Sequence, residues 1–294
     1  MMTDSTLDTA VPAEALPARR SRFRSSLAKD RKAQVGLVVL GLFIFGMVFA
    51  PLLAPYDPNE MTLDMMQGLS WAHPLGTDDL GRDLLSRILH GTQISIFVGV
   101  VTVAVALVIG VALGVIAGYY GGWIDLVIMR YIDLQWAFPN FIIAVYLVAV
   151  FGTGLVNVIV AISLAFIDDF ARVARSMTLS LREEQFVDAA RTMGFSDRRI
   201  IFRHILPSAM APIIVQATVS VSYAILGEAT LSFLGLGVEA TTPTWGLILA
   251  EGRGFISQAW WLGVFPGLAI MLVVLSINFV GDWLRDVFDV RESV

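Results

Sequence analysis

Residues 172–207 read RVARSMTLSLREEQFVDAARTMGFSDRRIIFRHILP and carry seven arginines between hydrophobic runs that contain almost no charge. At the centre of a lipid bilayer each arginine would cost about 2.5–3.5 kcal/mol, so the seven together would cost roughly 20 kcal/mol. The stretch must therefore lie outside the hydrocarbon core. A cationic, helix-forming insert of this kind is expected on the cytoplasmic face of a membrane protein, where it docks on another surface.

Composition places the chain among integral membrane proteins. Of its 294 residues, 56% are hydrophobic and 15% are charged, whereas soluble domains carry about 25% charged residues. The absence of cysteine excludes disulfides, thiolate metal sites and cysteine nucleophiles. The two lysines, Lys29 and Lys32, both precede the first hydrophobic run, so no phosphate-binding P-loop is present. We expect no catalytic residue, no metal site and no cofactor, and no ATP hydrolysis by this chain itself.

Five long uncharged runs define the expected membrane spans: 35–53, 91–124, 134–167, 205–227 and 254–281. A helix needs about 20 residues to cross the hydrocarbon core, whereas a single helix over 134–167 would extend roughly 50 Å. Gly152-Thr153-Gly154 lies near the middle of that run and supplies a turn, so we interpret the run as a helical hairpin. The sequence therefore predicts an all-α membrane protein with six transmembrane helices.

Basic residues set the orientation of these spans. With the N-terminus in the cytoplasm, 17 of the 20 basic residues lie inside and only Arg82, Arg87 and Arg253 lie outside, as the positive-inside rule requires. We therefore expect both termini in the cytoplasm. A cleaved secretory signal is an alternative for the N-terminus, but the first run is too long for a signal core and has no small-residue cleavage pattern.

This topology divides the chain into four parts. Residues 1–34 form a basic cytoplasmic tail, of which the first eighteen are expected to be disordered. Residues 35–91 hold the first span and an extracytoplasmic segment. Residues 92–283 form a five-helix core with a cytoplasmic loop at 173–207, and residues 284–294 are the C-terminal tail.

The second span repeats a small residue at every fourth position, at Gly110, Gly114 and Gly118. This spacing lets the backbone of a neighbouring helix approach closely, so we predict a tight packing seam against another span. The alternative is that glycine is simply common in membrane helices.

The insert itself has the pattern of two short helices. Phe186, Ala189, Ala190 and Met193 recur at i, i+3, i+4 and i+7, which predicts one apolar helix face. Gly194 follows directly, as expected for a left-handed C-terminal cap.

A second short helix is expected after the glycine. Ser196 is placed to be its N-cap and Asp197 lies in its first turn, while Pro207 marks the transition to the fifth span. The resulting compact knob is suited to docking on another protein. The alternative from the residues alone is an amphipathic loop on the lipid headgroups, with its arginines paired to anionic phosphates.

We expect residues 77–90 to form an external amphipathic helix capped by Thr77. Four apolar residues share one face of it: Leu84, Leu85, Ile88 and Leu89. His73 and His90 lack the spacing of a metal site and are expected on the surface.

Three acidic residues fall in or beside the apolar runs. Glu228 lies deep in the run 205–236, and an ionisable group there is a functional-site hypothesis by default. Alternatively it lies near the outer headgroups, or forms hydrogen bonds within the segment 228–246 and only stiffens it. Asp168 and Asp169 are expected at the cytoplasmic end of the fourth span.

The order of residues in the insert is similar to that of a known family. Asp188-Ala189-Ala190, then Gly194, then Leu206-Pro207 twelve residues on closely resembles the "EAA" loop of binding-protein-dependent ABC importer permeases, with Asp188 where the motif has Glu. The resemblance implies a coupling loop that inserts into a groove on an ATPase subunit. Its residues are Glu184, Asp188, Ala189, Ala190, Gly194, His204, Leu206 and Pro207.

The resemblance covers residues 35–290. Four further segments are similar to dipeptide/oligopeptide permeases: PLGTDDLGRD at 74–83, LSFLGLG at 231–237, PTWG at 243–246 and GDWLRD at 281–286. A basic tail before a first span that ends in APYDP at 54–58 resembles their C-type (DppC/OppC-like) subunit. For the segment 77–90, contact with a binding protein is the alternative to a purely structural helix.

The resemblance implies a type I ABC importer permease fold. The chain would form half of a pathway that carries di- or oligopeptides, or a similar small solute, inward across a bacterial cytoplasmic membrane by alternating access. Implied partners are a second homologous permease, two ATP-binding subunits, an extracytoplasmic solute-binding protein and membrane lipid, but no nucleic acid. Glu228 is a possible pathway residue, because the fifth span lines the pathway in these permeases. Nickel, glutathione, opines and sugars remain open as solutes.

Two other classes of protein fit the sequence less well. An ion-coupled secondary carrier needs several intramembrane acids or histidines and often has an inverted repeat, whereas only Glu228 lies in mid-run and no repeat is visible. A membrane-embedded enzyme needs paired catalytic groups within the spans, but His73, His90 and His204 all fall outside them.

Overall fold

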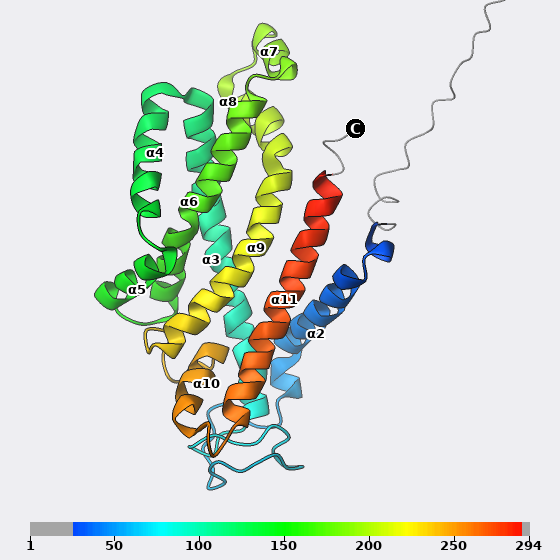
Figure 1. The fold of residues 1–294 in the computed structure, drawn as a ribbon, viewed down its shortest axis with the longest axis vertical. Coiled ribbons are helices and arrows are strands. Elements are labelled where there is room, and N and C mark those ends of the chain that lie inside the picture. Colours follow the sequence, from blue (N-terminus) through cyan, green and yellow to red (C-terminus); the bar gives the residue numbers. More distant parts are fainter. Residues whose placement is uncertain (1–25, 290–294) are drawn as a thin grey trace, which may run out of the picture.

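The computed structural model describes residues 26–289, so the arginines before Ser26 and the tail residues 290–294 lie outside the described residues. All regular structure in that part of the chain is helical (Figure 1). The helices are α2 (Arg31–Leu53), α3 (Leu84–Tyr120), α4 (Gly122–Trp136), α5 (Asn140–Phe151), α6 (Leu155–Leu181), α7 (Gln185–Thr192), α8 (Asp197–Ile200), the π-helical turn η1 (Ile201–Ile205), α9 (Leu206–Phe233), α10 (Trp245–Gly252), the 3-10 turn η2 (Arg253–Phe255) and α11 (Trp261–Asp289).

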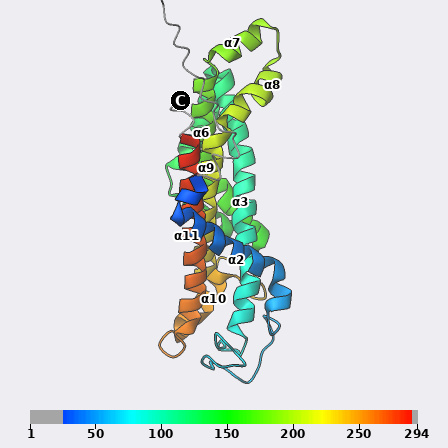
Figure 2. The same cartoon turned by 90° about the vertical axis from the view of Figure 1, so that its right-hand side faces the viewer.

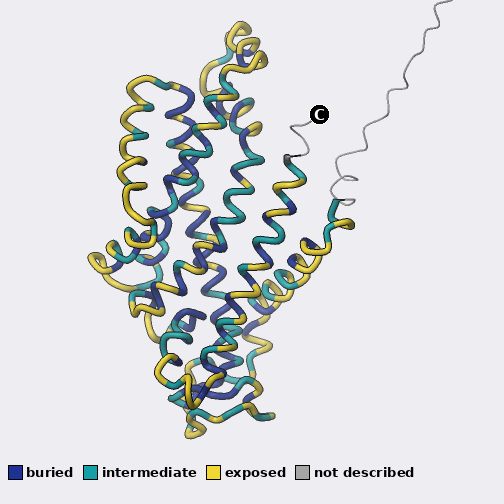
Figure 3. Tube along the Cα trace, viewed as in Figure 1, coloured by how far each residue is buried: buried dark blue, intermediate teal, exposed yellow. Residues whose placement is uncertain are grey.

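The long helices form a bundle around α3. Helix α3 packs on α2, α6 and α9, while α11 packs on α2 and α9. Buried residues concentrate where α3, α6 and α9 meet, whereas much of α2 and α4 is exposed and apolar (Figure 3). Such long exposed apolar helices are typical of lipid-facing surfaces. Helices α7 and α8 project from one end of the bundle, and α10 with the loop 54–83 covers the other end (Figure 2).

Four helical stretches are long and apolar enough to cross a membrane: Arg31–Leu53, Leu84–Tyr120, Asp197–Phe233 and Trp261–Phe288. Helices α4 and α5 qualify only as a pair, which is bent by 86°. Helix α6 runs beside α3 but carries Asp168, Asp169 and Arg172 within its apolar part. The described residues therefore contain four or five candidate spans by length and composition, and α6, with these three charges, is not among them.

The expected hairpin over 134–167 is correct at its turn and wrong at its start. Gly152 and Gly154 form the turn between α5 and α6 with φ of 94° and 125°, values that favour glycine. The helical segment before the turn, however, starts earlier than expected, with α4, which begins at Gly122 directly after α3. It ends at Trp136 because Pro139 disfavours helical backbone before it, and α5 then runs in a new direction.

Residues 77–83 are not helical, which corrects the helix expected over 77–90. Gly81 has φ of 74° and interrupts the helical pattern, and the N-cap of α3 is Asp83, whose carboxylate accepts from Ser86 N at 2.8 Å. His73 is also wrongly placed on the surface: it is 4% exposed, and its Nδ1 lies 2.9 Å from Asp83 Oδ1. A buried carboxylate at a helix start therefore orders both the helix and the preceding loop.

Asp168 and Asp169 do not mark the end of a helix. Helix α6 continues from them to Leu181, so both lie in its middle. The helix can continue because Arg175 binds Asp125 on α4 and Arg182 donates to Gly118 O, which provides partners for the charges beyond Asp169.

The predicted glycine seam is confirmed, and its partner is α6. A β-carbon at Gly110 would lie 2.6 Å from Ile167 O, and one at Gly118 would lie 2.9 Å from Arg175 O. At Gly114 it would overlap Ala171 O. Because backbone rather than flexible side chain fills these positions, only glycine fits along this face of α3.

Replacing Gly114 by leucine should therefore destabilise the bundle. Overpacking of a filled interface costs about 1–3 kcal/mol or more, so we expect a lower melting temperature of the purified protein in detergent, or loss of folded protein. The matched control is Gly41→Leu, because Gly41 lies in α2 with no atom near its β-carbon position. Equal melting temperatures for Gly114→Leu and the unmodified protein would contradict the seam.

Candidate functional site

The projecting segment 183–207, here called the knob, contains α7, α8 and η1. Its own small core consists of Val187, Ala190, Ile200 and Ile205, each no more than 1% exposed. These side chains belong to the main hydrophobic cluster of the bundle. The knob is therefore attached to the helices behind it by apolar packing as well as by the chain.

The apolar face predicted for α7 is divided between two directions. Ala190 points inward, whereas Phe186, Ala189 and Met193 lie on the outer surface. Met193 is 65% exposed and Phe186 is 40% exposed. Two large exposed apolar side chains, one on this short helix and one at its C-cap, indicate a contact surface for another molecule.

Acidic residues border this outer face. Glu184 is the N-cap of α7, and its carbonyl accepts from Val187 N at 2.9 Å. The Asp188 carboxylate is exposed and accepts from Arg191 Nη1 at 3.3 Å, one turn along. Ala189 lies between Asp188 and Ala190 and adds no bulk, which leaves a close approach to α7 open.

Gly194 ends α7 in the left-handed conformation, with φ of 78°. Its N–H donates to Arg191 O at 2.9 Å, and Phe195 N–H donates to Ala190 O at 3.1 Å. These two bonds form a Schellman cap. No atom lies near the β-carbon position of Gly194, so the glycine is required by its backbone and faces open space.

The second helix begins where expected but is held differently. Ser196 occupies the N-cap position of α8 without a side-chain capping bond. Asp197 instead accepts from the Tyr119 hydroxyl at 2.7 Å, which connects the knob to the end of α3.

The knob joins α9 through a widened turn. Leu206 N–H donates to Ile201 O, five residues back, and Pro207 follows with no N–H and a bulky ring in the preceding turn. The π-helical geometry accommodates that ring. The imidazole of His204 stacks on Phe195 with ring centroids 6.1 Å apart, so η1 packs against the turn that Gly194 forms.

Glu228 lies in α9, away from the knob, and is fully buried. It accepts from Ser232 Oγ at 2.7 Å and from Ser95 Oγ at 3.3 Å. Ser95 also accepts from Trp245 N at 3.3 Å. The carboxylate therefore joins α9, α3 and α10.

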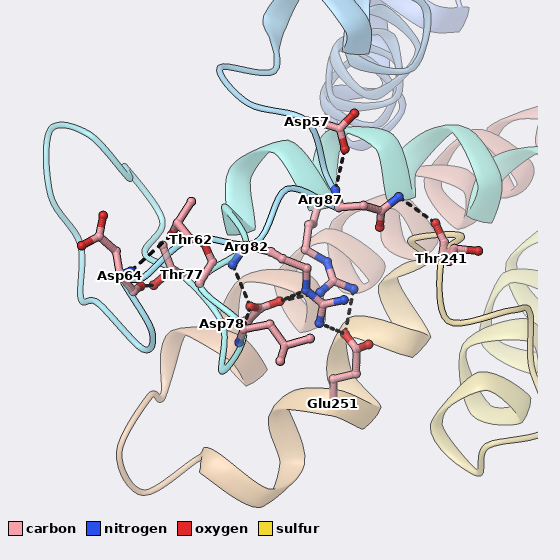
Figure 4. A network of polar contacts seen from close by, with 12 residues as sticks. Asp57, Thr62, Asp64, Thr77, Asp78, Arg82, Arg87, Thr241 and Glu251 are labelled. Carbon is pink, nitrogen blue, oxygen red and sulfur yellow. Dashed lines mark hydrogen bonds and ion pairs between the residues drawn. The ribbon is translucent and has the colours of Figure 1, made fainter.

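A buried ion-pair network at the opposite end of the bundle was not predicted from the sequence (Figure 4). Arg82 Nε and Arg87 Nη1 both donate to Asp78 Oδ2, at 2.6 and 2.5 Å. Arg87 Nη2 donates to Glu251 Oε2 at 2.7 Å, and Arg82 Nη2 reaches the same oxygen at 3.1 Å. The network fastens the 54–83 loop and α3 to α10. Within residues 26–289 no three His, Asp or Glu side chains converge as metal ligands would.

Comparison with known proteins identifies the family. Residues 110–294 match the binding-protein-dependent transport system inner membrane component, and residues 20–73 match the N-terminal TM domain of oligopeptide transport permease C. The first match covers more than half of the chain.

Several curated proteins are similar along most of their length. The Dipeptide transport system permease protein DppC of Alkalihalophilus pseudofirmus is 47% identical over 90% of this chain and 87% of its own. The Di/tripeptide transport system permease protein DppC of Pseudomonas aeruginosa is 41% identical over 95% and 94%. The Glutathione transport system permease protein GsiD of Pectobacterium atrosepticum is 44% identical over 92% and 90%.

Among solved structures, a chain of the MetNI methionine ABC transporter in an inward-facing conformation superposes with a TM-score of 0.58. It shares 20% sequence identity and covers 69% of this chain and 97% of its own. The bundle thus shares the fold of that transporter chain. The chain belongs to the family of binding-protein-dependent transport system inner membrane components, and its N-terminal region is of the oligopeptide transport permease C type.

Proposed function

We propose that this chain is one of two permease subunits of an ATP-driven ABC importer that carries di- or oligopeptides, or a similar small solute, across the bacterial inner membrane. The observation that carries the proposal is the knob, which presents an apolar surface at one end of a membrane bundle. The relatives support the solute class, since their names refer to dipeptides, di- and tripeptides and glutathione. The proposed partners are a second homologous permease, two ATP-binding subunits and an extracytoplasmic binding protein, within membrane lipid.

The proposed topology has six spans with both termini in the cytoplasm. The spans are α2, α3, the bent pair α4–α5, α6, α9 and α11. This arrangement is supported by the sides on which the chain ends lie: α2 begins and α11 ends toward the end of the bundle that carries the knob (Figure 1). It also keeps the arginines of the knob in water, as their solvation requires.

In this proposal the knob is the coupling element. Its outer apolar face would enter a groove on an ATP-binding subunit, and the acidic side chains of Glu184 and Asp188 would lie at the edge of that contact. A movement of the knob would pass directly into α6, which enters it, and α9, which leaves it. An ion-coupled secondary carrier is disfavoured, because the chain's family uses binding-protein-dependent transport.

Gly194→Asp should uncouple the transporter. A side chain at φ of 78° costs about 1–3 kcal/mol of strain, and the added charge would face the docking partner. We expect weaker co-purification of the ATP-binding subunits, or ATP hydrolysis without uptake. The matched control is Gly122→Asp, since Gly122 also has positive φ and open space around it but lies outside the knob. Uptake at the unmodified rate by Gly194→Asp would show that the coupling assignment is wrong.

A role for Glu228 in the pathway is a further part of the proposal, supported by the rarity of carboxylates inside membrane spans. Glu228→Gln removes the charge but keeps the shape and the bonds to Ser95 and Ser232, so we expect slower uptake by an assembled, ATP-hydrolysing complex. Ser232→Ala is the control, because it removes one hydrogen bond and leaves the carboxylate. Unchanged uptake by Glu228→Gln would leave this residue with a structural role only, as a polar link between α3, α9 and α10.

A further inference from the structure

A hollow of about 420 Å³ is lined by residues of α5, α6 and α9 and is open on one side, where Tyr223 is 59% exposed. Its walls are mainly aromatic and aliphatic, with Phe141, Phe166, Tyr223 and Leu226 among them. The polar groups that reach it include Asn140, Thr230 and the carboxylate of Asp169. Its size falls at the lower end of the range for small-molecule sites, about 300–1,000 Å³.

Asp169 has no hydrogen-bond or ion-pair partner for its carboxylate among the residues that the structure describes. Its neighbour Asp168 differs: it is fully buried on another side of α6, where Gln135 Nε2 donates to it at 3.3 Å. The two adjacent carboxylates therefore have separate surroundings, and only that of Asp169 faces the hollow.

The nearest cations on α6 are directed elsewhere. Arg172, one turn along, donates to Asp133 Oδ1 at 2.9 Å, and its guanidinium lies 4.4 Å from the ring centre of Trp136. Arg175 makes two bonds to Asp125. Both arginines are thus engaged with α4. Among the described residues, Arg172 is the cation whose charge acts on Asp169, but its guanidinium is bound to Asp133. The Asp169 carboxylate is therefore left to accept a cation from a bound solute.

We propose that Asp169 binds the ammonium group of the transported solute in this hollow. The inference rests on the proposed function, because every unmodified peptide carries an N-terminal ammonium whatever its side chains. A single carboxylate recognises that common group, while the apolar walls accept side chains of different shape. Asn140 and Thr230 supply hydrogen-bonding groups for the peptide amide.

The test uses the complete transporter, with a cysteine introduced by Thr230→Cys into this cysteine-free chain. The rate of thiol modification is measured with a cationic and with an anionic methanethiosulfonate reagent. An uncompensated carboxylate should make the cationic reagent faster by roughly tenfold. Asp169→Asn should abolish this preference, and the matched control Asp168→Asn should keep it. Dialanine should slow the modification, whereas N-acetyl-dialanine should not.

Several results would overturn the inference: equal rates for the two reagents, no modification of the thiol, or equal protection by both dipeptides. Loss of the second permease on purification of Asp169→Asn would also overturn it, since the missing cation would then belong to that subunit. A peptide uptake assay distinguishes failure of this inference from failure of the proposed function. Peptide uptake without a preference for the cationic reagent would contradict only this inference. If the preference for the cationic reagent depends on Asp169 but no peptide is taken up, the peptide is not the solute and the hollow is a site for another cation.

Discussion

The close backbone contact between α3 and α6 determines how the helices of the bundle and the knob are placed. It exists because the glycines at 110, 114 and 118 leave no side chain between the two helices. The contact continues to the point where α6 enters the knob, where Arg182 donates to Gly118 O at 2.8 Å. One residue on, Tyr119 binds Asp197 of α8. The seam therefore holds the knob in a defined position relative to the bundle.

A knob held in this way can transmit movement to the helices that flank it. Helix α6 leads into it and α9 leaves it through a π-helical turn, so a force on the knob reaches both sides of the Asp169 hollow. At the far end of α9, Glu228 connects that helix to α3 and α10. The proposed docking surface, the proposed solute hollow and the outer loop are thus joined by α6 and α9, which would allow ATP hydrolysis to be coupled to solute movement.

Local pattern predicted the features that depend on neighbouring residues. The apolar runs, the turn at Gly152 and Gly154, the seam and the left-handed Gly194 each follow from spacing or from a backbone conformation that glycine favours. Features set by tertiary contacts were missed. Arg87 and Glu251 lie 164 residues apart, so no sequence spacing predicts their ion pair. The expected helix is wrong over 77–83 because Asp78 accepts from the backbone of that loop and from Arg82 and Arg87 rather than forming part of a helix start.

In the proposed function, the outer face of the knob contacts an ATP-binding subunit in the cytoplasm. Its most direct test is crosslinking in the assembled transporter, with single cysteines from Met193→Cys on the knob or Gln67→Cys in the opposite loop. A short thiol–amine crosslinker should join the cysteine at 193 to an ATP-binding subunit and should give no such product at 67, because that site lies across the membrane. An adduct from 67, or none from 193, would contradict this contact.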